Sequence, residues 1–328
     1  MVCLWVMLFT SSAAWAGSLP FSREGQVMGV SGEITVWATD ATAAARALDL
    51  GWGELRRVEQ VFSMVRQGSA VNEINQFAAS RPVEISPEVV GVLQWAGNIY
   101  RVTQGAYDIT SAAFAWEYGF GQGEFRVPAP ERLEAVKACV GYKNIMLYPR
   151  DKTVMFKRAG MQLDFGEIAR SHALNSVKAC LVKLGISAAR IRVGRSITWL
   201  GANPAGAFWN EGVPHPRDAR KWLTMLEVPG GKVLSSGDDE RFFLQAGVRY
   251  HAVLDPATGK PETNALAATL WLPEKVKLDL PSEALLLMPP AQAMDLVRTI
   301  PGAEALIVDA QNNIWMTPGW KGKLKIQW

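Results

Sequence analysis

The order in which helix and strand patterns follow one another most constrains the fold of this 328-residue chain. Helix patterns over 41–62, capped by Asp40, and over 167–184, ended by Gly185, alternate with strand patterns. A third helix begins at Ser86-Pro87, and Gly105 is a natural stop for it. Further helices are expected at 128–139, 281–287 and 291–299, and strands at 26–37, 144–156 (a pair), 191–200, 267–272, 305–309 and 314–315. Because no regular strand–helix–strand repeat appears, the pattern predicts an α+β fold with a mixed sheet, not a doubly wound parallel sheet.

Composition limits the function classes. Hydrophobic residues make up 49% and charged residues 20%, which is typical of a chain with a packed core. The formal charge is +3 and no run of Lys or Arg occurs, so the sequence indicates no nucleic-acid partner. Without repeats or a linker, residues 17–328 are expected to form one domain.

The first sixteen residues, MVCLWVMLFTSSAAWA, resemble a secretory signal peptide. An apolar run precedes small residues and an Ala14-Trp15-Ala16 end, although no Lys or Arg comes first. We therefore expect an exported, periplasmic protein. Cys139 and Cys180 would remain after cleavage, and the sequence is compatible with a disulfide or with two free thiols.

The segment 233–261 concentrates polar residues at two turns. Ser235-Ser236-Gly237-Asp238 and the pair Glu240-Arg241 precede the strand-like run RYHAVLDP, which ends in a turn over 255–259. One interpretation is a β-hairpin with ordinary turn residues. The other is a site for a polyanion or a metal ion.

Metal-binding chemistry would have to use oxygen ligands. The chain has three histidines and lacks the HExxH pattern, and GxGxxG, Walker A and GxSxG patterns are also absent. Asp164 precedes a helix start, where backbone N–H groups favour an anion. Asp279 and Glu283 lie four residues apart, on one helix face. Carboxylates of this kind are the ligands that Mg²⁺ prefers.

Several blocks resemble, in order, the motifs of the ApbE family, the bacterial FAD:protein FMN transferases. The resemblance covers nearly the whole chain after residue 17. The blocks are Met28-Gly29, Phe62-Ser63 with Ser69 and Ile74-Asn75, GAYDIT…YGFG (105–121), LDFGEIARSHALNSV (163–177), Gly194, SSGDDERFF (235–243), YHAVLDPATGKP (250–261), LDLPSEALLLM (278–288) and PGAEALIVD (301–309).

The resemblance implies a T-fold-related architecture, two intimately packed lobes with a ligand cleft between them. It also implies FAD as substrate and Mg²⁺ on its diphosphate. A Ser or Thr of an exported or membrane-anchored flavoprotein would attack the FMN phosphorus, and AMP would leave.

Carried over position by position, the resemblance implies three sets of site residues. The FAD-binding set is Met28, Ala106, Tyr107, Asp108, Asp164, Arg170, Ser236, Gly237 and Asp255. The catalytic set is Asp279, Arg170 and His251, and the metal ligands are Asp279, Glu283 and the backbone carbonyl of Ala169.

Several of these positions depart from the family pattern. Glu283 occupies the position of a threonine metal ligand in the family, and Arg170 the position of a lysine. Ala252 occupies the position of the family's more regular histidine. Neighbouring residues on a strand point to opposite faces, so His251 replaces that histidine only if a bulge turns it inward. Further departures are Val65 for an aromatic residue, Glu167, Ser171 and His172 in the block 163–177, and Arg195 and Ser196 after Gly194.

Two hypotheses follow from these departures. The chain is either an exported Mg²⁺-dependent FMN transferase with a remodelled site or an ApbE-like FAD- or FMN-binding protein with little catalysis. An FAD diphosphatase, with water as the acceptor, is a variant of the first.

Overall fold

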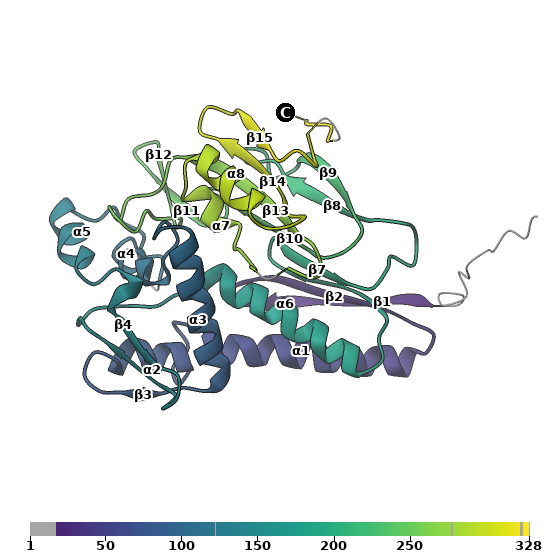
Figure 1. Ribbon diagram of the computed structural model, residues 1–328, viewed down its shortest axis with the longest axis horizontal. Helices are drawn as coiled ribbons and strands as arrows, with labels where there is room; N and C mark the ends of the chain where they lie inside the picture. The colour runs from purple at the N-terminus through teal and green to yellow at the C-terminus, as the bar shows by residue number, and fades with distance from the viewer. Residues whose placement is uncertain (1–17, 122, 277, 322–323, 328) are drawn as a thin grey trace, which may run out of the picture.

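A computed structural model describes residues 18–121, 123–276, 278–321 and 324–327 (Figure 1). The predicted signal peptide, residues 1–16, lies outside the described residues. Over the described ranges, no helix is both long and apolar enough to cross a bilayer.

The centre of the fold is an eight-stranded sheet in the order β1-β2-β6-β7-β10-β13-β14-β15. Every neighbouring pair in this sheet is antiparallel. Its strands are β1 (Leu19–Val27), β2 (Val30–Ala38), β6 (Ala188–Val193), β7 (Ser196–Leu200), β10 (Lys232–Gly237), β13 (Ala265–Leu272), β14 (Glu304–Asp309) and β15 (Ile314–Met316). The α+β class is confirmed, whereas the expected mixture of parallel and antiparallel strands is not found in this sheet, because its successive strands pair antiparallel.

Helices cover one face of this sheet. The helix α1 (Ala41–Phe62) packs on β1 and β2, and α6 (Gly166–Lys183) packs on β6 and β7. The short α7 (Glu283–Leu286) contacts β10 and β13, and α8 (Pro290–Arg298) contacts β14 and β15. Figure 1 shows α1 and α6 running together beneath the strands.

A hairpin covers the other face. It consists of β8 (Trp209–Pro214) and β9 (Trp222–Val228), and it packs with Trp199 and Trp320 in a second core. Successive side chains of β10 point to opposite faces of the sheet. Leu234 therefore packs in the core on the helix side, and Val233 packs in the core on the hairpin side.

A second lobe follows α1 in the chain and gathers beside one end of that helix (Figure 1). It contains α2 (Ala70–Phe77), α3 (Pro87–Val102), the turn η1 (Ile109–Ser111), α4 (Ala112–Glu117), α5 (Pro130–Lys137), the turn η2 (Tyr142–Asn144) and the small sheet of β3 (Val83–Glu84), β4 (Ile145–Tyr148) and β5 (Thr153–Phe156). The hairpin of β11 (Phe242–Gln245) and β12 (Val248–His251) packs against it through an aromatic cluster.

Two residues of the blocks that resemble the ApbE motifs have structural roles in this lobe. Ser69 caps α2 by accepting a hydrogen bond from Asn72 N at 3.0 Å. Asn75 exchanges two hydrogen bonds with the backbone of Leu163, so it ties the lobe to the segment that enters α6.

Two strand predictions were wrong in the same way. Residues 26–37 are parts of two strands, because Met28 and Gly29 form a turn with φ values of 54° and 74°. Residues 191–200 are likewise split, by a turn at Gly194 with φ 60°. Left-handed backbone at both positions closes a tight hairpin. The helix over 41–62 is confirmed with its Asp40 cap, and Cys139 and Cys180 are free thiols.

Candidate functional site

A cavity of ≈ 600 Å³ lies where the second lobe meets the helix-covered side of the central sheet. Its described lining residues come from the β1–β2 turn, the end of α1, the region of η1 and α4, the start of α6, the end of β10 and α7. The predicted residues on its wall are Met28, Tyr107, Asp108, Asp164, Ala169, Arg170, Ser236, Gly237 and Glu283. Ala106, His251, Asp255 and Asp279 are not among the described lining residues.

The start of α6 places a cation and a turn carboxylate on the cavity wall. Asp164 accepts a hydrogen bond from Gly166 N at 2.9 Å and so fixes the entry to the helix. One turn later, the guanidinium of Arg170 lies 3.9 Å from the carboxylate of Glu240. Within the described part of the chain, its buried Nε has no hydrogen-bond partner. A buried donor left in this state is costly unless a ligand meets it.

A cluster of four residues, called here the Glu167 cluster, connects α6, β10 and the start of α7. Glu167 is fully buried and accepts hydrogen bonds from Ser236 Oγ at 3.2 Å, Ser282 Oγ at 2.7 Å and Glu283 N at 2.8 Å. Burial, and then the charge of Glu167, raise the pKa of Glu283 to about 8. The Glu167 cluster therefore holds two acidic side chains close together, of which Glu283 lines the cavity, and the charge of Arg170 only partly balances them.

A second cluster, called here the Lys232 cluster, lies between α6, β10 and residue 279, one turn further along α6. Lys232 Nζ contacts Ser171 Oγ at 2.6 Å and is ion-paired with Asp279 Oδ2. The Asp279 carboxylate also accepts from Ser171 at 3.1 and 3.2 Å and from Asn175 Nδ2 at 3.2 Å. Asp279 is thus engaged by an ammonium of the chain itself, away from the cavity wall.

The polar residues of the GAYDIT block are held by hydrogen bonds at the lobe side of the cavity. Asp108 is buried and accepts from Thr110 N at 2.8 Å, Thr110 Oγ1 at 2.6 Å and Tyr142 N at 2.8 Å. Burial raises the pKa of Asp108, while these donors oppose the shift. Burial also raises the pKa of Tyr107, followed by the negative charge of Glu283. Ala106 supports the wall from behind, where it packs against the main core.

The cavity receives Ala252 and not His251. Ala252 lines the wall, whereas His251 is 5% exposed and occupies the last position of β12. Burial lowers the pKa of His251, and its Nδ1 has no hydrogen-bond partner among the described residues. The expectation that adjacent residues face opposite ways is confirmed, and no bulge brings the imidazole to the cavity.

Asp255 organises the turn that follows. Its carboxylate accepts from Ala257 N at 2.9 Å and from Thr258 Oγ1 at 2.7 Å. Gly259 has φ 72°, and a Cβ there would lie 2.5 Å from the ring of Phe114. Residues 255–259 thus form the turn that the sequence predicts, and Ser236 and Gly237, from the other polar stretch, line the cavity.

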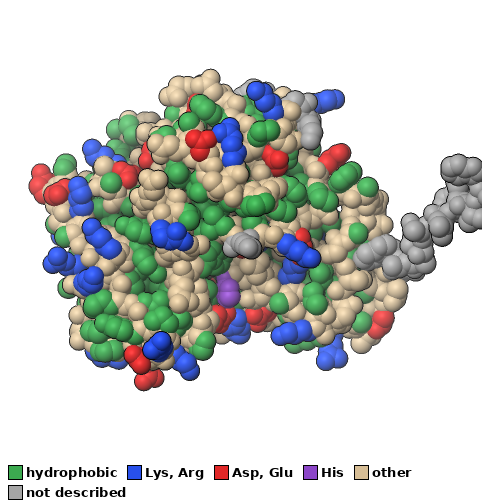
Figure 2. Space-filling model, in the orientation of Figure 1, with side chains coloured by type: hydrophobic (Ala, Val, Ile, Leu, Met, Phe, Trp, Pro, Cys, Tyr) green, Lys and Arg blue, Asp and Glu red, His purple; other side chains and the backbone are tan. Residues whose placement is uncertain are grey.

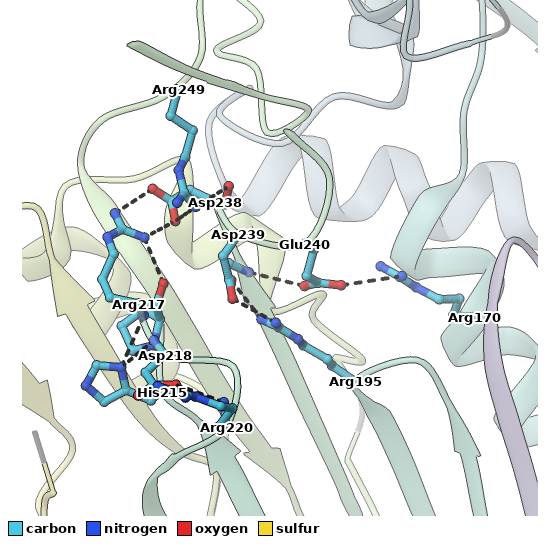
Figure 3. A network of polar contacts seen from close by, with 12 residues as sticks. Arg170, Arg195, His215, Arg217, Asp218, Arg220, Asp238, Asp239, Glu240 and Arg249 are labelled. Atoms are coloured by element: carbon cyan, nitrogen blue, oxygen red, sulfur yellow. Dashed lines mark hydrogen bonds and ion pairs between the residues drawn. The ribbon is translucent and has the colours of Figure 1, made fainter. Parts of the chain in front are cut away.

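The turn between β10 and β11 holds a network of arginine–carboxylate pairs (Figure 3). Arg217 binds Asp238 through two hydrogen bonds of 2.6 and 2.8 Å, and Arg195 binds Asp239 through two of 2.9 and 2.8 Å. Figure 3 shows Arg170 set apart from them, directed only at Glu240. The unusual Arg195 therefore has a carboxylate of its own and is not a free cation for a ligand.

Sequence reasoning missed several residues of the wall. Glu59 accepts from Met28 N at 2.6 Å, Phe120 and Arg241 line the cavity, and Glu240 faces Arg170. Glu240 and Arg241 were visible as a charged pair, but the approach of Glu240 to Arg170 depends on the turn at Gly237. Lys232 gave no signal, because its partner Asp279 is 47 positions away.

On the face shown in Figure 2, Lys and Arg side chains are scattered and interspersed with Asp, Glu and hydrophobic side chains. They form no continuous basic surface on that face.

An α+β fold with a cavity between two lobes, lined by Arg170, Arg241 and apolar residues, defines a ligand-binding protein. The chain belongs to the ApbE family, whose model matches residues 28–307. It is 26% identical to a protein of Treponema pallidum named FAD:protein FMN transferase, over 93% of this chain and 89% of that one. A protein of the same name from Escherichia coli K12 is 24% identical, over 92% and 88%.

Solved structures agree with the fold. The crystal structure of the ApbE protein from Thermotoga maritima has a TM-score of 0.84 and 26% identity, covering 92% of this chain and 98% of that one. The flavin transferase ApbE from Vibrio cholerae has a TM-score of 0.79 at 22% identity, covering 93% and 99%.

Proposed function

We propose that this protein is an FAD:protein FMN transferase. It would attach FMN through a phosphoester bond to a Ser or Thr of a flavoprotein and release AMP. The hydroxyl oxygen forms a bond to the FMN phosphorus, the phosphoanhydride bond breaks, and AMP leaves with that electron pair, while the hydroxyl proton is lost. The observation that carries the proposal is the guanidinium of Arg170 on the cavity wall, because its planar fork of N–H donors suits the FAD diphosphate.

Mg²⁺ fits one corner of this cavity. The described residues contain no group of three or more His, Cys, Asp or Glu that could hold a metal. Mg²⁺, however, is often held by one or two carboxylates together with substrate phosphates. Burial, and then the charge of Glu167, raise the pKa of Glu283, and the charge of Arg170 does not cancel the shift. Glu283 and the carbonyl of Ala169 would hold the ion, which supplies charge neutralisation on the phosphate oxygens.

The other cavity residues would bind and orient the substrates. Arg170 would hold the diphosphate, and the Met28–Gly29 turn, Tyr107 and Phe120 offer apolar surface to the flavin or adenine ring. The acceptor is proposed to be an exported or membrane-anchored flavoprotein, and the periplasmic location rests on the resemblance of residues 1–16 to a signal peptide.

The test is a transfer assay with purified protein, FAD, Mg²⁺ and an acceptor flavoprotein domain. Acceptor labelling is followed by in-gel flavin fluorescence, and AMP is quantified in parallel. We expect equal amounts of label and AMP, with R170M binding FAD at least about tenfold more weakly, the scale of a charge-assisted hydrogen bond. R170K, which keeps the cation, is the matched control. A wild-type protein with no affinity for FAD, with or without Mg²⁺, would disprove the proposal.

A flavin-binding protein with little catalysis is the second candidate, and Ala252 favours it. This residue occupies the cavity wall where the family resemblance implies a histidine. If an imidazole there is the missing general base, A252H should raise the transfer rate by about 10²-fold or more. H251A should leave the rate within about twofold, because His251 lies off the wall. FAD binding without label or AMP in wild type supports the second candidate, and AMP without label supports an FAD diphosphatase.

A further inference from the structure

Lys232 is a buried ammonium that the proposed reaction does not use. It begins β10 and is 7% exposed, and it shares a strand face with Leu234 and Ser236, directed at α6. Ser236 reaches Glu167 on that helix, and Lys232 reaches Ser171, one turn further along. Strand β10 thus presents two polar contacts to α6, and only the one at Ser236 reaches the cavity.

The contacts of Lys232 resemble those of a bound cation. Its Nζ meets one carboxylate oxygen, on Asp279, and one hydroxyl oxygen, on Ser171. The side chains of Lys232 and Asp279 are 9% and 19% exposed, so the pair is largely removed from water. Buried charges need a partner of this kind, because an isolated one is strongly disfavoured.

We infer that Lys232 is an internal counter-cation that occupies Asp279 in place of a divalent metal ion, so that Asp279 positions the segment 279–283 and does not bind the metal. A metal ion at Asp279 Oδ2 would have to displace the ammonium or share the oxygen with it, and two cations at that spacing repel each other. The divalent cation is left to Glu283. This last step rests on the proposed function, whereas the occupation of Asp279 does not.

The pairing also has a positioning consequence. Asp279 lies just before Ser282 and Glu283, which bind Glu167 on α6. Trp95 Nε1 donates to the carbonyl of Asp279 at 2.8 Å, so the backbone at this point is fixed from α3 as well. The Lys232 cluster therefore holds the segment that presents Glu283 to the cavity.

The test asks whether removing the ammonium creates a metal site. In an E283Q background, which lacks the cavity carboxylate, K232M should free Asp279, and Mn²⁺ should raise the melting temperature. E283Q alone should show no Mn²⁺-dependent rise, and E283Q/K232M/D279L should lose the rise, because the neutral pair packs without a charge. No FAD is needed, so a failure of the proposed function does not affect this result.

Two outcomes overturn the inference. One is a Mn²⁺-dependent rise in E283Q alone that D279L removes, since Asp279 would then bind metal in the presence of Lys232. The other is the absence of any rise in E283Q/K232M. A second measurement uses Mn²⁺ electron paramagnetic resonance on the FAD-bound protein. K232M/D279L should keep the wild-type Mn²⁺ affinity within about twofold and E283Q should lose about tenfold or more, whereas equal losses would again assign the metal to Asp279.

Discussion

The Lys232 cluster and the Glu167 cluster connect the same three segments, α6, β10 and residues 279–283, and differ in charge. In the Lys232 cluster one ammonium meets one carboxylate, with a hydroxyl and an amide completing the contacts. In the Glu167 cluster the carboxylate of Glu167 meets two hydroxyls and the backbone N–H of Glu283, and Arg170 is shared with Glu240. In the first cluster the positive charge matches the negative charge, and Lys232 and Asp279 are not among the described lining residues of the cavity. In the second the acidic side chains outnumber the cation, and Ser236 and Glu283 line the cavity.

This difference separates a structural polar cluster from a binding one. A complete cluster stabilises the fold and has no use for a ligand, whereas a carboxylate excess at a cavity wall is relieved by a cation or by protonation. The arginine–carboxylate network around Asp238 and Asp239 is of the same structural kind as the Lys232 cluster, because each carboxylate is paired with an arginine.

Breaking the complete cluster should have the largest effect on stability. K232M leaves Asp279 buried without its cation, and we expect the free energy of unfolding to fall by about 3–5 kcal/mol. Urea unfolding measures it. K232M/D279L, which removes both charges, should recover most of the loss. A K232M protein as stable as wild type would show that the pair contributes nothing.

Breaking the Glu167 cluster should have a smaller effect. E167L removes the acceptor for Ser236, Ser282 and the N–H of Glu283, and should cost about 1–3 kcal/mol in urea unfolding. The loss is partly offset because the repulsion between Glu167 and Glu283 also disappears. E167Q, which retains an acceptor oxygen, is the control and should lose less. Equal losses in both variants would contradict this account.

Per pH unit, the protonation of Glu283 gives the smallest expected effect, and it also gives the sharpest comparison. Its pKa is about 8 in the folded state against 4.5 as the ordinary value, so the folded protein holds an extra proton between these pH values. The free energy of unfolding should therefore fall as pH rises from about 4.5 to 8, by at most about 1.4 kcal/mol per pH unit. The difference between wild type and E283Q in metal-free buffer isolates this slope, and identical slopes would refute it.

Local patterns predicted those parts of the fold that local interactions decide. Asp40 and the apolar stripe after it define α1, and Ser86-Pro87 defines the start of α3, because caps and helical spacing act within a few residues. The hairpin turn at Met28-Gly29 was missed, since a methionine in the left-handed region is uncommon and carries no local signal. The strands β8 and β9 were also missed.

The candidate site shows the same division. The blocks of family resemblance identified Tyr107, Asp108, Asp164, Arg170 and Ser236, and all of them line the cavity. The resemblance did not predict the orientation of the side chains of His251 and Asp279, or the residues that each of them contacts.

The sequence by itself determined the α+β class, most of the helices and the family, because these depend on periodicity, capping and ordered motifs. Only the tertiary structure decided that Ala252 faces the cavity, that Arg195 pairs with Asp239 and that Asp279 pairs with Lys232. The physical reason is that the role of a buried charged group depends on the group it pairs with. These partners are distant in the chain and meet only when the protein folds.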